Sequence, residues 1–574
     1  MIKNIFLILN NKSKKLIFIL LLLYIPTLIL ETISLSAIPI FIMFLNDPSF
    51  LVEKIPFETL QTLLLEMKSS DRAIKGSIFL LILFTFKSLA LTFITLIENY
   101  TQRTISVFTA TKLYRYYLHK KYNFFIKNIP STLIQNLGDA PRVTSVIMSC
   151  LNLLKESLLI LTIFIIIIIN SPDSFLQVFL GIISLIMIFL FLTNNYIKDK
   201  GNASRKGRRM VLKENLESFL GIKFTKIMQK EEFFIDKFSR YNNETKKADM
   251  MLSFFTRMPR YWFELMVIIL FCFIINYYST HSTGTSNSLP LLSFLGICAI
   301  RLLPGMGAVV NAISIIRFNY ISAQTFKDIP KSYDQAIERQ EKKIVLSDEK
   351  NFTLKINNLS FSHNDANIKK IIDNVSLEFK NNLIVGITGG SGSGKTTFVD
   401  LILGLLKPSN GTINYNDNDI SIFGDSWKNK VSFVPQNVYL FGSTLKENIV
   451  FDEIEKGTID EKRLLEAIRI AELEEVVSGL ENGMNTHLSY SGSKLSGGQV
   501  QRIGIARALY KESKILIFDE ATSSIDCDNE KKILGNLTKI KKEILILHVT
   551  HRNEVMNYCD QIFKIQNGKI NQEK

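Results

Sequence analysis

The sequence predicts a two-part chain, in which an all-α domain of six transmembrane helices precedes an α/β domain of the P-loop nucleotide-hydrolase class. Two observations predict it. Apolar residues make up 47% of the 574-residue chain and gather in long runs over 1–323. The segment 389–396 then reads GGSGSGKT, between a short apolar strand and the start of a helix. We expect a charged linker over 324–350 and a nucleotide-binding domain over 351–574.

Six segments are long and apolar enough to cross a bilayer. The third contains the run IFIIIII at 163–169, which a soluble core could hardly accommodate. The predicted spans cover 16–45, 74–98, 152–170, 175–197, 261–278 and 288–318.

Basic residues predict the orientation of these spans. The loop 100–150 carries seven Lys or Arg against one acidic residue, 198–260 carries sixteen against eight, and 46–73 carries three against five. Because basic loops stay in the cytoplasm, we expect the N-terminus and the nucleotide-binding domain inside, in a bacterial inner membrane. Contact with anionic membrane lipids explains the net charge of +15, so no nucleic-acid partner is expected.

The segment 389–396 has the pattern of a phosphate-binding loop. Glycines let backbone N–H groups curl around phosphates, Lys395 reaches the outer ones, and Thr396 offers a hydroxyl to Mg²⁺. Such a loop alone leaves many activities open. The candidate ATP-binding residues of this segment are Gly389, Ser391, Gly392, Ser393, Gly394, Lys395, Thr396 and Thr397.

Two later motifs narrow the class. The run LSGGQ at 495–499, followed by QRIGIARAL at 501–509, resembles the signature of ATP-binding-cassette (ABC) proteins. The run ILIFDE at 515–520 resembles a Walker B motif. Six spans followed by one cassette resemble the half-transporter type of ABC exporter, and this resemblance covers the whole chain.

The resemblance implies a role for each motif residue. Asp519 would hold Mg²⁺, and Glu520 would act as general base on the attacking water. Gln436 matches a glutamine that contacts Mg²⁺, and His551 matches a switch histidine on the terminal phosphate. Asp526 matches a loop that communicates across a dimer.

The remaining ATP contacts are also implied by the family. His363 stands where most relatives have a tyrosine that stacks on adenine. In this family the signature of one cassette faces the phosphate loop of a second, so a symmetric homodimer is the simplest complete form. The signature residues are Ser496, Gly497, Gly498 and Gln499. His548 we interpret as a strand residue without a role in the site.

Cations inside the spans are the candidates for cargo binding, since charges there are costly and tend to face a cavity. Lys87, Arg260 and Arg301 suit an anionic group such as pyrophosphate. Two other interpretations stay open. Arg260 could reach lipid head groups or line the cytoplasmic mouth. All three could form ion pairs within the protein, with partners among Glu31, Glu98, Glu156 and Glu264.

The sixth span, with AIRLLPG at 299–305, resembles that of bacterial flippases for lipid-linked oligosaccharides. An amphipathic external stretch at 56–68 resembles that group too, although a helix packed on the protein's own spans is an equal alternative. The implied cargo is a polyprenyl-pyrophosphate-linked glycan, for protein glycosylation or O-antigen assembly. The alternatives are a general lipid, drug or peptide exporter, and an ATP-gated channel or regulator, which the presence of Glu520, Gln436 and His551 disfavours.

Overall fold

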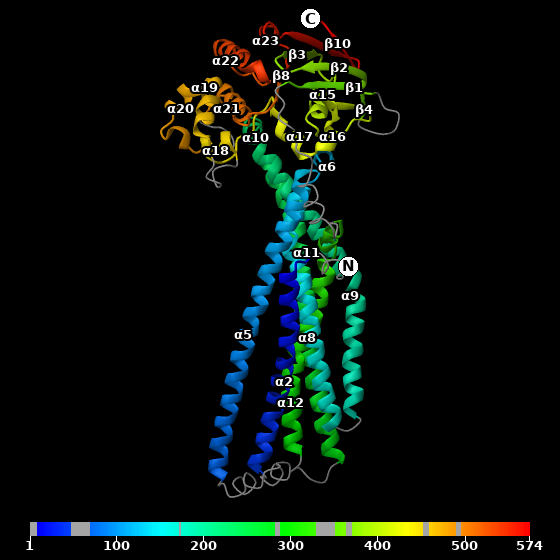
Figure 1. Cartoon of the computed structure of the whole chain (residues 1–574). Helices are drawn as coiled ribbons and strands as arrows, with labels where there is room; N and C mark the ends of the chain where they lie inside the picture. Colours follow the sequence, from blue (N-terminus) through cyan, green and yellow to red (C-terminus); the bar gives the residue numbers. More distant parts are fainter. Residues whose placement is uncertain are drawn as a thin grey trace. The chain divides into compact units, whose positions relative to one another are not determined.

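A computed structural model of the chain describes residues 9–46, 69–170, 174–281, 288–328, 351–362, 370–451, 459–488 and 495–574. Its contacts divide the chain into two compact units. The helical unit consists of 1–120 and 125–333, and the nucleotide-binding unit consists of 121–124 and 334–574. The predicted fold class is confirmed, because an all-helical region precedes an α/β domain (Figure 1).

Long helices make up the helical unit, and each of the six predicted spans lies on one of them. They are α2 (Asn11–Asn46), α5 (Ser69–Leu118), α8 (Ala140–Asn170), α9 (Ser174–Leu220), α11 (Glu231–His281) and α12 (Ser288–Phe318). Shorter pieces are α6 (Tyr122–Lys127), α7 (Pro130–Gly138), α10 (Ile222–Ile227), α13 (Tyr320–Gln324) and the 3-10 turn Thr325–Asp328. α5 alone has 50 residues, about 75 Å of helix, so it extends well beyond a hydrocarbon core of about 30 Å.

Four stretches of the described residues are long and apolar enough to cross a membrane: Asn11–Ile42, Ser70–Leu118, Pro130–Ile165 and Arg301–Phe318. The fourth and fifth predicted spans lie on α9 and α11, where part of the side chains falls outside the described residues. Large apolar side chains of α5, such as Phe79, Leu81 and Leu89, are more than 60% exposed. Such exposure fits a helix that faces lipid.

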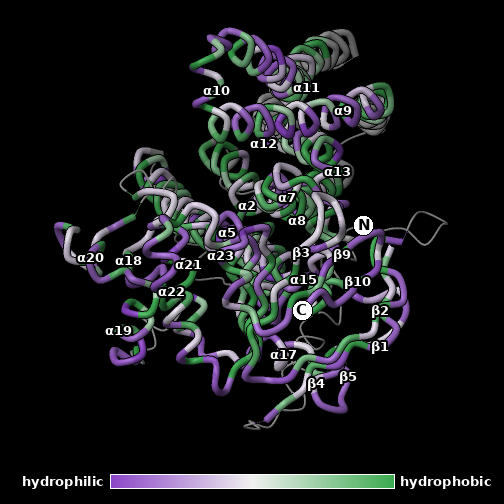
Figure 2. The backbone as a smooth tube through the Cα atoms, turned by 90° about the horizontal axis from the view of Figure 1, so that it is seen from above, coloured by the Kyte–Doolittle hydropathy of each residue, from purple (hydrophilic) through white to green (hydrophobic). Residues whose placement is uncertain are grey.

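Polar residues mark where α9 and α11 leave the apolar segment. The parts of both helices on either side of α10 are rich in hydrophilic residues (Figure 2). Further along, α9, α11 and α12 share a small apolar core of Leu190, Phe263, Met306 and Val310. α2 lies against α5, and α8 lies against α12. These helix pairs bring together the charged residues described below.

Two sheets build the nucleotide-binding unit. A four-stranded antiparallel sheet has the order β2-β1-β4-β5, and a six-stranded sheet has the order β10-β9-β3-β8-β7-β6. In the second sheet the pairs from β9 through β3, β8 and β7 to β6 are parallel, and β10 pairs antiparallel with β9. The strands are β1 (Thr353–Phe361), β2 (Ile372–Lys380), β3 (Ile384–Gly389), β4 (Asn410–Tyr415), β5 (Asn418–Asp419), β6 (Val431–Val434), β7 (Ile515–Asp519), β8 (Leu545–Val549), β9 (Gln561–Gln566) and β10 (Lys569–Gln572).

The nucleotide-binding unit has two lobes, and each lobe has its own apolar core. One lies with the two sheets and α15 and includes Phe398 and Trp427, and the other joins the six-stranded sheet to helices around α21 and includes Leu464 and Ile505. The helices are α15 (Lys395–Ile402), α16 (Ile420–Phe423), α17 (Asp425–Lys430), α18 (Leu445–Val450), α19 (Glu461–Ile470), α20 (Glu474–Ser478), α21 (Gly497–Tyr510), α22 (Cys527–Ile540) and α23 (Asn553–Met556). Because ligands of such sheets bind beyond the carboxyl ends of parallel strands, the ends of β3, β6, β7 and β8 define where to look.

Candidate functional site

The phosphate loop follows β3 directly and leads into α15. Gly392 and Gly394 have φ values of +73° and +103°, which L-residues rarely adopt. A Cβ at Gly394 would lie 2.9 Å from a methyl carbon of Ile371. Glycine is therefore needed at Gly394 for both conformation and space.

Lys395 holds this loop from within. Its buried Nζ donates to the carbonyl oxygens of Gly389, at 2.7 Å, and Gly390, at 3.1 Å. Ser393 Oγ is buried and has no hydrogen-bond partner among the described residues. A cationic amine, a hydroxyl with free capacity and the N-terminus of α15 together fit a phosphate group.

Asp519 is the last residue of β7, and Glu520 follows it. Glu520 has φ of +49°, and its N–H donates to the Val549 carbonyl at 2.8 Å, so backbone pairing holds it in a conformation that costs energy for a non-glycine residue. Burial and then the charge of Glu520 raise the pKa of Asp519, while Lys395 opposes this. A divalent cation between these carboxylates would relieve their repulsion, so the residues fit Mg²⁺.

Gln436 and His551 complete a continuous chain of polar groups. Gln436 Nε2 donates to Glu520 Oε2 at 2.7 Å, and His551 Nε2 lies 3.5 Å from Glu520 Oε1. His551 Nε2 also lies 2.9 Å from Lys395 Nζ. Four separate sequence motifs thus place the lysine, the histidine, the carboxylate and the amide within hydrogen-bond or ion-pair distance of a neighbour.

The signature segment forms the N-terminus of α21. Ser496 caps this helix, with reciprocal hydrogen bonds between Ser496 and Gln499. A Cβ on Gly498 would lie 2.7 Å from the carbonyl oxygen of Ser524. Asp526 caps α22 through Asn529, whose hydrogen bonds lower the pKa of the Asp526 carboxyl.

Gln501 is a site residue to which sequence reasoning gave no role. Its Nε2 donates to the Gln436 carbonyl, at 3.3 Å, and to Ser523 Oγ, at 3.1 Å, while its Oε1 accepts from the Ser524 N–H at 2.8 Å. Gln501 is 4% exposed. It therefore ties the signature helix to the Gln436 loop and to the segment after Glu520. The one sequence feature that could have pointed to this role is that Gln501 is a polar residue one turn into the helix that carries the signature.

His548 is a strand residue, as predicted. It lies buried in β8, and its ring stacks on Phe518 with centroids 4.5 Å apart. Burial lowers the pKa of His548 to about 4, so the ring is neutral at pH 7. His363 and the stretch 56–68 lie outside the described residues.

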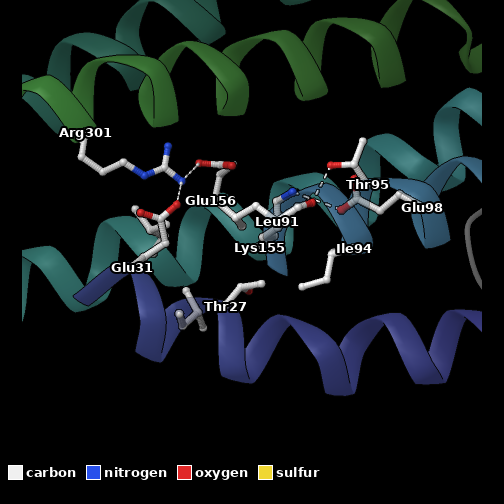
Figure 3. A pocket seen from close by; sticks show the side chains of 11 residues that line it. Thr27, Glu31, Leu91, Ile94, Thr95, Glu98, Lys155, Glu156 and Arg301 are labelled. Carbon is white, nitrogen blue, oxygen red and sulfur yellow. Dashed lines mark hydrogen bonds and ion pairs between the residues drawn. The ribbon is translucent and has the colours of Figure 1, made fainter. Parts of the chain in front are cut away.

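A second polar site lies among the helices of the helical unit (Figure 3). Glu31 of α2 lies 2.7 Å from Lys87 Nζ of α5 and 3.1 Å from Arg301 Nη2 of α12. Arg301 Nη2 also lies 3.9 Å from Glu156 of α8. Lys87 further donates to Ser34 Oγ at 2.7 Å. Both deep cations are thus ion-paired within the protein, which is the alternative that the sequence left open.

Two more charges adjoin these pairs. Lys155 of α8 donates to Glu98 Oε1 of α5 at 3.1 Å, and the Tyr24 hydroxyl donates to the same oxygen at 2.9 Å. We call the charged cluster the set Glu31, Lys87, Glu98, Lys155, Glu156 and Arg301. A cavity of about 270 Å³ is lined by these residues except Lys87, with Thr27 and Thr95 beside them. The cluster holds three cations and three carboxylates, so its charges balance.

Arg260 is not part of this cluster. Its guanidinium lies 2.9 Å from Glu264 on the same helix, and its side chain is 70% exposed. The structure therefore brings together two of the three expected cargo-binding cations, Lys87 and Arg301, and leaves Arg260 elsewhere on α11.

Comparison with known proteins identifies the class of the nucleotide-binding unit. Residues 372–523 match the family model described as ABC transporter. This match covers the phosphate loop, the signature and the Walker B carboxylates. The chain is similar to a putative export ATP-binding/permease protein of Rickettsia typhi, 38% identical over 219 residues, or 38% of each chain.

Two further similarities concern a curated relative and a solved structure. It is 36% identical over 202 residues to an ATP-dependent lipid A-core flippase of Ralstonia nicotianae, covering 35% of this chain and 34% of that one. Sequence similarity thus spans little more than a third of these relatives. The solved structure of a bacterial Atm1-family ABC exporter with ATP bound superposes with a TM-score of 0.77, covering 97% of this chain and 95% of that one at 16% identity. The fold is therefore that of the Atm1-type ABC exporter.

Proposed function

We propose that this chain is one half of a homodimeric, ATP-driven exporter in a bacterial inner membrane. The observation that carries the proposal is the continuous polar chain of Lys395, His551, Glu520 and Gln436 beside one phosphate loop. The similarity in fold to an ABC exporter over almost the whole length supports transport as its use. The N-terminus and the nucleotide-binding unit would then face the cytoplasm.

Each residue of the polar chain has a step in this proposal. The loop 389–396 would hold ATP by its phosphates, with Mg²⁺ at Asp519, Thr396 and Gln436. Glu520 would accept the proton of the attacking water, and His551 would contact the terminal phosphate. Ser496 to Gln499 of one copy would close the phosphate loop of the other, and His363 would lie on the adenine.

ATP hydrolysis by the purified dimer in nanodiscs tests the engine. We expect Mg²⁺-dependent hydrolysis by the wild-type protein, loss of turnover in Glu520→Gln, and unchanged nucleotide binding in that variant. Equal turnover in both proteins would refute the role of Glu520. Absence of hydrolysis in the wild type would favour an ATP-gated channel or regulator.

For the cargo, we propose a polyprenyl-pyrophosphate-linked oligosaccharide, turned from the cytoplasmic to the outer leaflet. Lys87 and Arg301 are deep cations that a pyrophosphate would neutralise, provided that it displaces the carboxylate of Glu31. Arg260 pairs with Glu264 instead and is not part of the proposed cargo site.

The second candidate is a general exporter of lipids, drugs or peptides. The balance of three cations against three carboxylates in the charged cluster favours it, because such a site has no excess positive charge for an anion. The similarity to a lipid A-core flippase fits either candidate.

Proteoliposomes holding a fluorescent polyprenyl-pyrophosphate oligosaccharide distinguish the two. ATP-dependent change in its accessibility to an external glycan-modifying enzyme, lost in Lys87→Ala with Arg301→Ala, supports the glycolipid. Arg260→Ala is the matched control and should transport like wild type. ATP hydrolysis without movement of this lipid would leave the general exporter as the function.

A further inference from the structure

A second cavity, of about 260 Å³, lies among the same four helices and shares Glu98 with the charged one. Four carboxamide side chains line it: Asn99 and Gln102 of α5, Asn152 of α8, and Asn311 of α12. Ser149 and Tyr24 add hydroxyl groups. We call it the amide cavity. Glu98 is its one charged lining residue, and the Tyr24 hydroxyl and Lys155 already bind that carboxylate.

The four amides of this cavity are not used by the fold. Within the part of the chain that the structure describes, none of their side chains has a hydrogen-bond partner. Asn152 and Asn311 lie within the third and sixth predicted spans, where polar side chains cost free energy and usually serve a function. Each amide offers two N–H donors and a carbonyl acceptor without net charge. This chemistry matches hydroxyl groups, which both donate and accept, and does not suit an apolar tail.

The amide cavity and the charged cavity lie at different depths along the same helices. Going from Glu31 to Tyr24 moves about 10 Å along α2, and going from Arg301 to Asn311 moves about 15 Å along α12. In the predicted topology both moves lead toward the cytoplasmic ends of the helices. A head group that enters from the cytoplasm would thus meet charged groups deeper and amides nearer the entrance.

We propose that the amide cavity is the subsite for the sugar part of the cargo, an uncharged, hydroxyl-rich group joined to a charged linkage in the neighbouring cavity. The identity of the lipid rests on the proposed function, but the preference for sugars does not. Asn152 and Asn311 are the central residues, because they come from α8 and α12 and are half-buried. The helices α8 and α12 lie against each other, and both residues line the cavity.

The test is ATPase stimulation of the full-length dimer in nanodiscs by two matched lipid pairs. The first pair is polyprenyl pyrophosphate with and without an oligosaccharide, and the second is diacylglycerol with and without a digalactosyl head. We expect half-maximal stimulation at a lower concentration of each sugar-bearing member. In Asn152→Leu with Asn311→Leu this preference should fall about 30-fold, since two lost hydrogen bonds together contribute about 2 kcal/mol. Responses to the sugar-free members should not change.

Asn195→Leu is the matched control, since Asn195 is an exposed amide of α9 outside both cavities. It should keep the full preference. Loss of the sugar-bearing and sugar-free responses together, or an unchanged preference in the double variant, would overturn the subsite. Sugar preference in the second pair without any response to the first would support the subsite and refute the polyprenyl cargo. No preference in the wild type for either pair would refute the subsite alone.

Discussion

The nucleotide site and the charged cluster are both polar, but they are assembled in opposite ways. Gln436, Glu520 and His551 each lie within two residues of the end of a strand of one sheet, and Lys395 begins the helix after the loop that follows a fourth strand, β3. The register of that sheet aligns Asp519 with Val549 and Val434 with Phe518, so the strand ends meet. Glu31, Lys87, Glu156 and Arg301 instead come from four different helices, where only side-chain packing decides which residues meet.

This difference sets what each site tolerates. In the nucleotide site the backbone fixes the geometry, as the positive φ of Glu520 and its hydrogen bond to Val549 illustrate. One side chain can therefore be exchanged without moving the others. In the charged cluster Glu31 is the common partner of two cations and is only 5% exposed, so its loss leaves both without their nearest carboxylate.

The largest expected effect is on catalysis in the nucleotide site. Glu520→Gln should lower the rate of ATP hydrolysis about 1000-fold, or about 4 kcal/mol, because the amide cannot accept the proton of water. Nucleotide affinity should stay near wild type, as Lys395 and the glycines are untouched. Steady-state hydrolysis and fluorescent-nucleotide titration measure the two. A parallel fall in affinity would show that the backbone does not isolate this side chain.

The same contrast decides how far the sequence predicts each site. Motifs located Lys395, Asp519, Glu520, Gln436 and His551 because strand-end residues converge once the sheet forms. No motif predicted the link made by Gln501, whose three partners depend on how α21 packs.

In the helical unit the sequence yielded the charged residues but not their pairs. The membrane-spanning helices carry apolar side chains on all their faces, so the spacing of apolar residues does not reveal which face turns toward the other helices. For this reason the sequence alone groups Lys87 and Arg301 with Arg260, which lies exposed beside Glu264. The pairing with Glu31 followed from contacts between α2, α5 and α12 alone.

The next largest effect is on the stability of the helical unit. Glu31→Gln keeps the shape but removes the charge between Lys87 and Arg301, and should cost about 3 kcal/mol. Thermal unfolding in detergent, followed by Trp262 fluorescence in a Trp427→Phe background, measures it. Arg260→Ala, which removes an exposed pair, should leave the midpoint unchanged. If both variants melt alike, Glu31 is not the centre of the cluster.

A smaller effect concerns pH and the nucleotide-binding unit. The pKa of His548 is about 4 in the folded protein and about 6.5 in the unfolded chain. Between these two values His548 is protonated in the unfolded chain but neutral in the folded protein, which favours unfolding. The contribution of His548 to the free energy of unfolding is therefore complete above pH 6.5, and about 2 kcal/mol of it should be lost at pH 5. Trp427 fluorescence in a Trp262→Phe background follows this unit. His548→Phe, which can still stack on Phe518, should remove that part of the pH dependence. An unchanged pH profile in this variant would assign the loss to other groups.

The smallest effect compares two glycines within the nucleotide-binding unit, where backbone geometry dominates. Gly535 lies inside α22, and no atom beyond its chain neighbours and the backbone of its own helix lies within 4 Å of the place that an added methyl would take. Gly535→Ala should therefore stabilise the unit by about 1 kcal/mol. Gly498 lies in the first turn of α21, and its added methyl would collide with the Ser524 carbonyl oxygen at 2.7 Å. Gly498→Ala should therefore destabilise the unit, and it should also slow hydrolysis because Ser524 is held by Gln501. Urea unfolding followed by Trp427 fluorescence measures both effects: the midpoint should rise in Gly535→Ala and fall in Gly498→Ala. If both substitutions raise the urea midpoint, the backbone around the signature can move to accept a methyl group. The nucleotide site would then lack the rigid backbone that distinguishes it from the charged cluster.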